Sequence, residues 1–410
     1  MPSIATASST TIMPPDPART PRAHPRPTRS APEGTGGKRR LDEPQPDGDE
    51  WVLWGGELMW AAGTTSGGAP YGLTYAEWRE AMREAEARSG WARALHALEG
   101  LARQRCPRAD HREVGRVVHL GAGLGRDAFA AELTVAPDPE RISAVYVVLL
   151  PRADAEDDSD RRVRREMAVL GTLASASLPF RVPRVLGAWP DRHGTTLART
   201  FMPGIPLDLR AGRQPSVRPW AVVGEIAAAI HRIDPATVPP ALAGPPTRQD
   251  HGRAALAALA ALDVPEAWDA LAWATEHLPP PEPARLLHGD LLGQNILLDP
   301  DSDPRHGVID WEHTACGDPA YDLAIVTRCA RQPFQIPGDA QRLLEAYHGS
   351  GGSPTVSLDH VRIHELALAA GWYRAGLADP DCGAHRMTES LHALRRVLRA
   401  AGTPGRESAG

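Results

Sequence analysis

Two short apolar runs, each bordered by an acidic or amide residue, constrain the fold of this chain more than any other feature. Asn295 comes directly before the run at residues 296–298, and Asp310 directly after the run at residues 307–309. The intervening DPDSDPRH is rich in turn-forming residues, so the two runs predict a β-hairpin. Such a hairpin brings Asn295 and Asp310 to the same end, close to Asp290 in the preceding HGDLLGQN.

These three residue types are what phosphoryl transfer from a magnesium nucleotide requires. Asp290 is the candidate catalytic carboxylate, which would orient or deprotonate an acceptor hydroxyl. Asn295 and Asp310 are the candidate metal ligands, because an amide oxygen and a carboxylate can hold the ion that neutralises the phosphates. Unrelated loop aspartates would explain HGD alone, but not all three residues in register.

The segment HGDLLGQN resembles the catalytic loop of the aminoglycoside phosphotransferase family, which are small-molecule kinases. VIDWEHTACGDPAYDLA is similar to the metal-binding segment of that family and the acidic turn after it. The resemblance implies an α+β, bilobal protein-kinase-like fold, with a small antiparallel-sheet N-lobe and a mainly helical C-lobe. It also implies ATP and Mg as cofactors, and supporting roles for His288, Asp318 and Asp322 in holding the catalytic loop.

A glycine-rich loop, GAGLGRDAF, contains Gly121, Gly123 and Gly125 and follows the β-branched run VGRVVHL. As a strand–turn–helix unit it would resemble a nucleotide or methyl-donor fingerprint. As a hairpin, it would cover nucleotide phosphates with backbone N–H groups, and AFAAELTV would be the returning strand. AFAAEL is too short for the required helix, so the hairpin is favoured.

The strand after this loop departs from the family pattern. The family places a lysine or arginine two residues ahead of a proline, whereas this chain has Leu149 before Pro151. Lys38 is the only lysine in the chain, which also excludes a Walker-type phosphate loop.

Glu166, in RREMAVL, occupies the position of the glutamate that pairs with this cation in the family. An arginine would then have to supply the phosphate-binding charge. Arg152 is favoured because it is adjacent to the expected position, and Arg126 is the second candidate. Strand alternation points Arg152 away from the face of Leu149 unless Pro151 bends the chain.

The segment GAWPDRHGTTLARTFMPGIPL resembles the strand and hinge between the two lobes. A nucleotide base is expected to bond to backbone groups from Thr200 to Met202 there. On the next amphipathic segment, His231 is expected to be structural. The C-terminal helices are expected to line the acceptor pocket, where the candidates are Glu312, Glu365 and Trp372, although packing or surface roles explain each of them more simply.

The N-terminal part has its own character. Trp51, Trp54 and Trp60 lie within a short stretch, and packing against the folded body is favoured over an aromatic ligand platform. Thr74 and Glu77 have the spacing of a helix capping box. Residues 50–110 are therefore expected to be mostly helical.

The sequence divides into five segments: a disordered, proline-rich tail (1–48), a helical N-terminal extension (49–110), a nucleotide-binding N-lobe (111–203), a catalytic and acceptor-binding C-lobe (204–402) and a flexible tail (403–410).

Composition narrows the class of protein. With 42% hydrophobic residues and a formal net charge of -6, the chain is typical of soluble globular proteins and not of nucleic-acid-binding ones. The four cysteines fit no zinc spacing, which favours a reducing compartment. No apolar run is long enough for a membrane span and no secretory signal is visible, so a cytoplasmic location is expected.

The predicted function is transfer of the ATP γ-phosphoryl group to a hydroxyl of a small polar molecule, foremost an aminoglycoside-like compound. A kinase for another hydroxyl substrate (an amino alcohol, a sugar or a macrolide) is the main alternative. The substitution at Leu149 raises a third reading, a nucleotide-binding protein with weak catalysis. The sequence leaves open the acceptor, the choice between ATP and GTP, and the oligomeric state.

Overall fold

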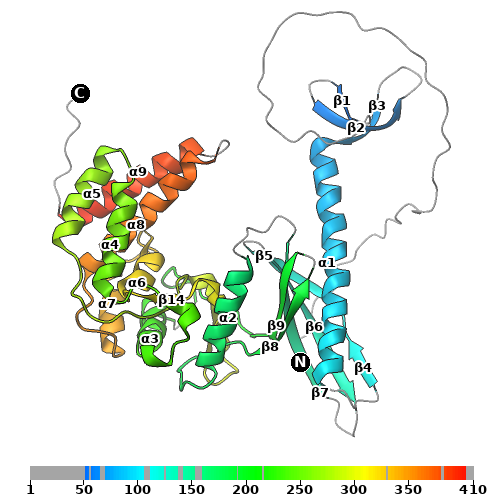
Figure 1. Cartoon of the computed structure of the whole chain (residues 1–410), viewed down its shortest axis with the longest axis horizontal. Helices are drawn as coiled ribbons and strands as arrows, with labels where there is room; N and C mark the ends of the chain where they lie inside the picture. Colours follow the sequence, from blue (N-terminus) through cyan, green and yellow to red (C-terminus); the bar gives the residue numbers. More distant parts are fainter. Residues whose placement is uncertain are drawn as a thin grey trace, which may run out of the picture. The chain divides into compact units, whose positions relative to one another are not determined.

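The computed structural model describes residues 51–54, 57–64, 70–105, 111–123, 126–136, 142–152, 159–191, 193–214, 217–328, 331–379 and 383–402 (Figure 1). The two predicted tails lie outside these residues. The chain divides into two compact units, Met1–Trp78 and Arg79–Gly410. Within the described residues, no helix is both long and apolar enough to cross a lipid bilayer.

The first unit contains a three-stranded antiparallel sheet: β1 (Trp51–Trp54), β2 (Glu57–Thr64) and β3 (Pro70–Thr74). A mostly helical extension was expected, but its first part forms strands, because aromatic and apolar residues such as those of WVLW favour paired, pleated backbone. Trp51 pairs with Trp60 across two strands. The tryptophan side chains themselves lie outside the described residues.

Helix α1 (Tyr75–Arg105) follows β3 directly. The predicted capping box is confirmed, since the Glu77 amide donates to Thr74 Oγ1 (3.2 Å) and the Thr74 amide donates to Glu77 Oε2 (2.8 Å). Farther along, a Cβ on Gly90 would lie 2.9 Å from the ring of Phe129, so glycine permits the close approach of α1 to the neighbouring sheet.

The N-lobe sheet is antiparallel and six-stranded, in the order β4-β6-β7-β9-β8 with β5 paired to β6. Its strands are β4 (His111–Val114), β5 (Val118–Gly123), β6 (Arg126–Ala136), β7 (Ile142–Pro151), β8 (Val185–Asp191) and β9 (Gly194–Thr200). The predicted hairpin around the glycine loop is confirmed, because β5 and β6 pair antiparallel. The strand–turn–helix alternative is wrong, since its helix would occupy β6.

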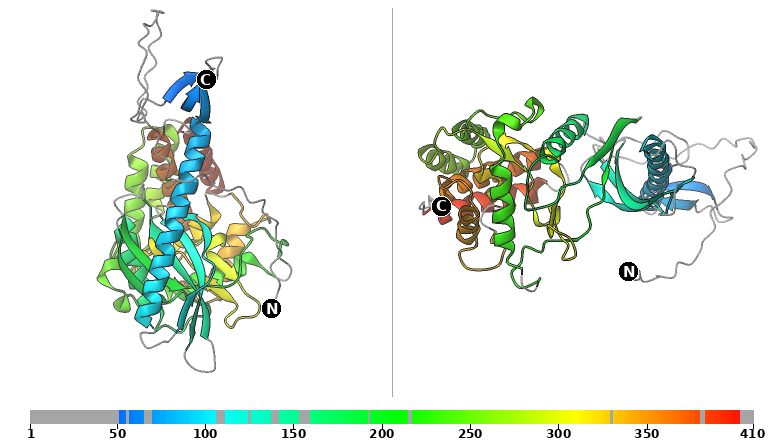
Figure 2. Two further views of the ribbon diagram at one scale, coloured as in Figure 1. Left: turned by 90° about the vertical axis from the view of Figure 1, so that its right-hand side faces the viewer. Right: turned by 90° about the horizontal axis from the view of Figure 1, so that it is seen from below.

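Helices cover both faces of this sheet (Figure 2). On one face, Ala94 and Leu98 of α1 pack with Phe129 and Ala198. On the other face, α2 (Ser159–Leu173) contributes Val163 to a core with Leu149 and Leu197.

The C-lobe is mainly helical, as predicted. Its helices are α3 (Pro219–His231), α4 (Arg248–Ala260), α5 (Pro265–Glu276), α6 (Ala320–Thr327), α7 (Asp339–Gly349), α8 (Leu358–Leu377) and α9 (Gly383–Ala400). Its short strands are β10 (Ile205–Pro206), β11 (Arg285–Leu287), β12 (Ile296–Leu298), β13 (His306–Val308) and β14 (Ala315–Gly317).

The predicted β-hairpin between Asn295 and Asp310 is confirmed. Strands β12 and β13 pair antiparallel, with Ile296 opposite Val308. The Ile309 amide donates to the Asn295 carbonyl (3.0 Å), so Asn295 and Asp310 lie at the same end of the hairpin.

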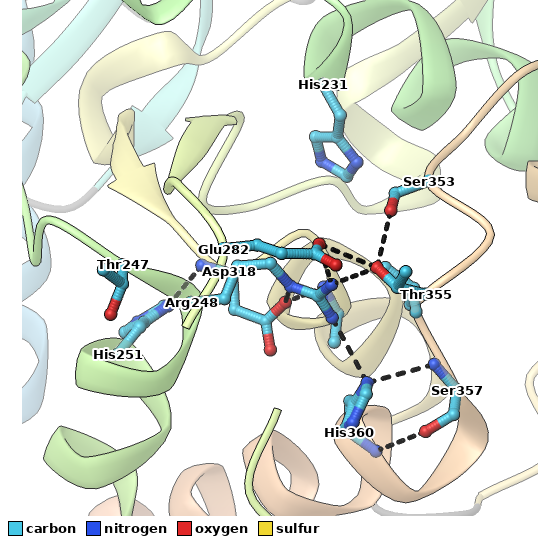
Figure 3. A network of polar contacts seen from close by, with 12 residues as sticks. His231, Thr247, Arg248, His251, Glu282, Asp318, Ser353, Thr355, Ser357 and His360 are labelled. Carbon is cyan, nitrogen blue, oxygen red and sulfur yellow. Dashed lines mark hydrogen bonds and ion pairs between the residues drawn. The ribbon is translucent and has the colours of Figure 1, made fainter. Parts of the chain in front are cut away.

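A buried polar network joins four segments of the C-lobe: α4, the loop before β11, the turn before α6 and the segment that leads into α8 (Figure 3). Arg248, the first residue of α4, is 1% exposed. Its guanidinium donates to Asp318 Oδ1 (2.7 Å), Glu282 Oε2 (2.8 Å) and Thr355 Oγ1 (2.6 Å), and a further nitrogen lies 3.2 Å from His360 Nδ1.

Asp318 has partners beyond Arg248. Its Oδ2 lies 3.1 Å from His364 Nε2 on α8, and its amide donates to His251 Nδ1 on α4 (2.8 Å). Burial and the neighbouring His364 lower the pKa of His251 to about 3, so the ring stays neutral and accepts this bond. Burial alone would raise the pKa of Asp318, but the hydrogen bonds from His364 and Arg248 lower it well below its usual range. The charged carboxylate therefore fixes the start of α6 to α4 and α8.

Replacing Arg248 with methionine should destabilise the protein strongly. The change leaves a buried carboxylate without its cation, and breaking a buried ion pair in this way costs about 3–5 kcal/mol. Urea unfolding should show a loss of this size. Arg253→Met is the matched control on the same helix, because the Arg253 side chain is 59% exposed and its pair with Asp250 is at the surface. Equal stability of the two variants would contradict a structural role for the network.

Candidate functional site

The catalytic loop lies between β11 and β12 and presents Asp290 at a half-buried position. The Asn295 amide nitrogen donates to the Asp290 carbonyl (2.8 Å) and to its Oδ2 (3.1 Å). Gly289 has φ of 84°, and a Cβ there would lie 2.3 Å from the His313 carbonyl, so only glycine fits. These contacts therefore fix the backbone of the loop around the Asp290 carboxylate.

His288 links this loop to the end of the hairpin. Its side chain is fully buried; Nδ1 accepts from the Asp290 amide (3.2 Å), and Nε2 donates to the Ile309 carbonyl (3.0 Å). Both contacts are made by the neutral ring, and burial lowers the pKa of His288 accordingly. The geometry gives this histidine no free proton to transfer.

Asp322, at the start of α6, holds the other side of the loop. Its two oxygens accept the consecutive amides of His288 (2.8 Å) and Gly289 (2.9 Å). His231 Nε2 lies 3.0 Å from Asp322 Oδ2, and His231 Nδ1 lies 3.1 Å from the Tyr347 hydroxyl, as fits the structural role expected of His231. Burial alone would raise the pKa of Asp322, but the hydrogen bond and charge of His231 lower it below its usual range.

Asp310 follows β13 in the left-handed backbone conformation, with φ of 70°. Non-glycine residues in this conformation are uncommon, and they gather at functional sites. Burial and the neighbouring Glu312 raise the pKa of Asp310 to about 6. A divalent cation would relieve this unfavourable burial of charge.

Asn295 and Asp310 fit a magnesium ion. The Asn295 nitrogen is used by Asp290, which leaves its amide oxygen as the coordinating atom. Among the described residues, no cluster of three or more His, Cys, Asp or Glu side chains could hold a metal alone. Mg²⁺ is typically held by one or two carboxylates together with substrate phosphates and water, so these residues match a nucleotide-dependent site.

Several of the candidate site residues line a cavity of about 680 Å³. It is lined by Leu120, Arg126, Ala128, Leu149, Glu166, Arg199, Asp290, Gln294, Asn295, Ile309, Asp310, Glu312 and His313. Asp290, Asn295 and Asp310 therefore meet at one cavity, and Leu149 faces the same space.

Two arginines accompany Glu166 on the wall of this cavity. Arg199 Nη1 lies 2.5 Å from Glu166 Oε1, and Arg126 Nη1 lies 3.6 Å from Glu166 Oε2. Leu149 pairs with Leu197 of β9 and with Ala128 of β6. Arg199 lies two residues after Leu197, and Arg126 lies two residues before Ala128. Side chains two residues apart on a strand point to the same face, so both arginines project from the face of the sheet that carries Leu149.

The structure does not place Arg152 among the residues that line the cavity. It follows β7 directly, one residue beyond Pro151, and is half-buried. The structure thus brings Arg126, the second candidate, and Arg199 to Glu166. Arg199 was not among the residues predicted from the sequence, although an arginine that alternates with an apolar residue, Leu197, on a strand was a usable signal.

The remaining candidates have different positions. Gly121 and Gly123 lie in β5 opposite Ala128 and Arg126, whereas Gly125 lies outside the described residues. The Thr200 amide donates to the Arg184 carbonyl, so this backbone donor already has a hydrogen-bond partner within the protein.

The hinge residue Met202 approaches the catalytic hairpin, since a Cβ on Gly307 would lie 2.8 Å from Met202 Cε. Of the acceptor candidates, Glu312 lines the cavity and pairs with Arg162 (3.6 Å). Glu365 is buried in α8, and the Trp372 ring packs against Arg331 (5.9 Å).

The chain is similar to known phosphotransferases. A model of the phosphotransferase enzyme family matches residues 136–358. The chain is 28% identical over 253 residues to an aminoglycoside 3'-phosphotransferase from Streptomyces fradiae (58% of this chain, 89% of that protein). It is 32% identical over 211 residues to a viomycin phosphotransferase from Streptomyces vinaceus (45% of this chain, 68% of that protein).

The fold is also found among solved structures. The structure of the GDP and kanamycin complex of APH(2")-IIia aligns with a TM-score of 0.53 at 14% identity, over 74% of this chain and 99% of that one. This likeness confirms the predicted bilobal, protein-kinase-like fold. With the family model matching more than half of its residues, the chain belongs to the phosphotransferase enzyme family.

Proposed function

We propose that this protein transfers the γ-phosphoryl group of ATP to a hydroxyl of a small, positively charged molecule of the aminoglycoside type. The observation that supports this most directly is the meeting of Asp290, Asn295 and Asp310 at one cavity, beneath the β5–β6 hairpin. The hairpin contributes Leu120 to the cavity wall, in line with a cover over nucleotide phosphates.

The charge of the cavity supports a metal cofactor. Among the described residues, its lining has four carboxylates (Glu166, Asp290, Asp310 and Glu312) and two guanidinium groups, those of Arg126 and Arg199. A triphosphate would be repelled by this excess of negative charge unless a cation came with it. Bound Mg²⁺, held by Asn295 and Asp310, would neutralise phosphate oxygens during transfer.

Side chains of the protein itself carry out the other steps, which are proton transfer and phosphate binding. Asp290 accepts the proton of the acceptor hydroxyl or orients it for in-line attack, and Asn295 keeps the carboxylate in place. Arg199 and Arg126 contact the phosphates in place of the missing lysine, while Glu166 orients both guanidinium groups. The base bonds to backbone groups near Met202.

The same excess of carboxylates favours a cationic acceptor over a neutral one. Amino groups on the substrate would add positive charge beside Glu312, which already pairs with Arg162, whereas a neutral sugar or macrolide would bring no charge to offset the excess of carboxylates. The two relatives named above are phosphotransferases for an aminoglycoside and for viomycin.

A screen of acceptors tests this proposal. ADP or GDP release is measured with ATP and GTP against aminoglycosides, viomycin, amino alcohols, neutral sugars and macrolides. Acceptor-dependent release with cationic compounds, weakened by added salt, is the expected result. Turnover only with neutral acceptors would contradict the electrostatic argument, and nucleotide binding without turnover of any acceptor would favour a weakly catalytic protein.

Replacing Asp290 with asparagine should abolish most turnover but preserve nucleotide binding. The amide keeps the size of the side chain but cannot take a proton, and loss of a general base costs about 10²- to 10⁴-fold in rate. Single-turnover kinetics and nucleotide titrations measure the two properties separately. Asp301→Asn, at an exposed position in the hairpin linker, is the control. Equal rates for the two variants would remove Asp290 from the mechanism.

Replacing Asp310 with asparagine should selectively remove the metal-dependent part of nucleotide binding. The variant loses a charged ligand, so binding of a fluorescent ATP analogue should weaken far more with Mg²⁺ than without it. Asn295→Ala should act in the same direction but more mildly, because it removes a neutral ligand. If the parent protein bound the nucleotide equally with and without Mg²⁺, both metal assignments would be refuted.

Arginine replacements test how the chain compensates for Leu149. Arg199→Met should raise the KM for ATP or lower kcat at least tenfold, about 1.4 kcal/mol, because it removes charge beside the phosphates. Arg126→Met should act similarly. Arg152→Met is the matched control, since Arg152 does not line the cavity. A larger effect of Arg152→Met would instead support Arg152, the residue favoured from the sequence, as the cation that contacts phosphate.

A further inference from the structure

A second cavity, of about 810 Å³, lies on the opposite face of the N-lobe sheet, between α1 and the β8–β9 hairpin. It shares no lining residue with the catalytic cavity. Strand β9 separates the two, because Ala198 packs against α1 while Leu197 packs with Leu149 on the other face. Helix α1 also lies outside residues 136–358, which match the family model.

A buried polar atom of Thr196 contributes to this second cavity. The Thr196 side chain lines it and is fully buried, and within the described residues its hydroxyl makes no hydrogen bond. Buried hydroxyl groups are nearly always paired in folded proteins, so an unpaired one at a cavity wall points to a partner from outside the chain.

The other lining residues define the chemistry of such a partner. Trp189 lines the cavity from β8 with an aromatic side chain, while Arg93, His96 and Gln104 line it from α1 with polar side chains. The described lining contains no carboxylate. Arg93 is oriented by a hydrogen bond from Nη2 to the Pro151 carbonyl (3.0 Å). An aromatic surface beside a positioned guanidinium suits a planar ring that carries an anionic group.

We propose that the cavity between α1 and the β8–β9 hairpin is a binding site for a small aromatic acid. Its ring stacks on Trp189, its anionic group pairs with Arg93, and Thr196 donates or accepts a hydrogen bond at the buried end. Because the site lies on the opposite face of the sheet from the catalytic cavity, this ligand binds alongside the nucleotide and does not compete with it.

Calorimetric titration of the full chain with 2-naphthoate tests the proposal. We expect one site per chain, with equal affinity in the presence of saturating ADP and Mg²⁺. The neutral 2-naphthalenemethanol and the non-aromatic cyclohexanecarboxylate should each bind about tenfold more weakly, because they lack the anionic group and the aromatic ring respectively.

Amino-acid replacements test whether 2-naphthoate binds in this cavity. Arg93→Gln and Trp189→Leu should each weaken 2-naphthoate about tenfold. Gly100→Phe should abolish binding, because Gly100 lines the cavity and nothing lies within 4 Å of a Cβ there, which leaves room for a ring to fill it. The controls are Arg103→Gln and Trp91→Leu on the same helix, at positions that do not line the cavity.

Thermal unfolding and nucleotide binding of each variant show that the fold is intact. Absence of 2-naphthoate binding to the parent chain would overturn the proposal, as would unchanged affinity in Gly100→Phe. Displacement of 2-naphthoate by ADP would overturn it too, because it would assign the ligand to the catalytic cavity. None of these outcomes depends on whether the protein phosphorylates an acceptor.

Discussion

The geometry of the catalytic loop depends on one carboxylate, that of Asp322. It accepts two consecutive backbone amides, those of His288 and Gly289, directly before Asp290, the proposed catalytic carboxylate. Without it, these buried N–H groups would lose their partners, a substantial cost in free energy. Asp322 itself lies one turn after Asp318, which Arg248 and His364 hold in place. The position of Asp290 is therefore set by charges buried among α4, α6 and α8.

In the N-lobe, the buried carboxylate of Glu166 requires a neighbouring cation. Leu149 occupies the position where the family has a cation, yet Glu166 remains and is 1% exposed. A buried carboxylate without a cation would be strongly disfavoured. Arg199 and Arg126 supply that charge from the two strands on either side of Leu149. Both arginines lie on the same face of the sheet as Leu149, so positive charge is kept beside Glu166 at the wall of the candidate site.

The sequence predicted the parts of the site that depend on local chain geometry. The spacing of Asn295 and Asp310 indicated the β12–β13 hairpin, and the short AFAAEL segment indicated a returning strand instead of a helix. It did not reveal Arg199, because the meeting of Arg199 and Glu166 depends on β9 lying next to β7 in the sheet. It also missed the strands at residues 51–74, where aromatic residues fit helical and extended patterns alike.

The N-lobe sheet has unlike faces because two different helices cover it. Toward α2, the strands carry the arginines that meet Glu166. Toward α1, they carry small residues such as Ala198, and Gly90 lets the helix approach. Farther along α1, the helix and the β8–β9 hairpin enclose a space lined by Trp189 and Thr196. Strand β9 lines both spaces, because it directs Arg199 toward Glu166 in the candidate active site and Thr196 into the second cavity.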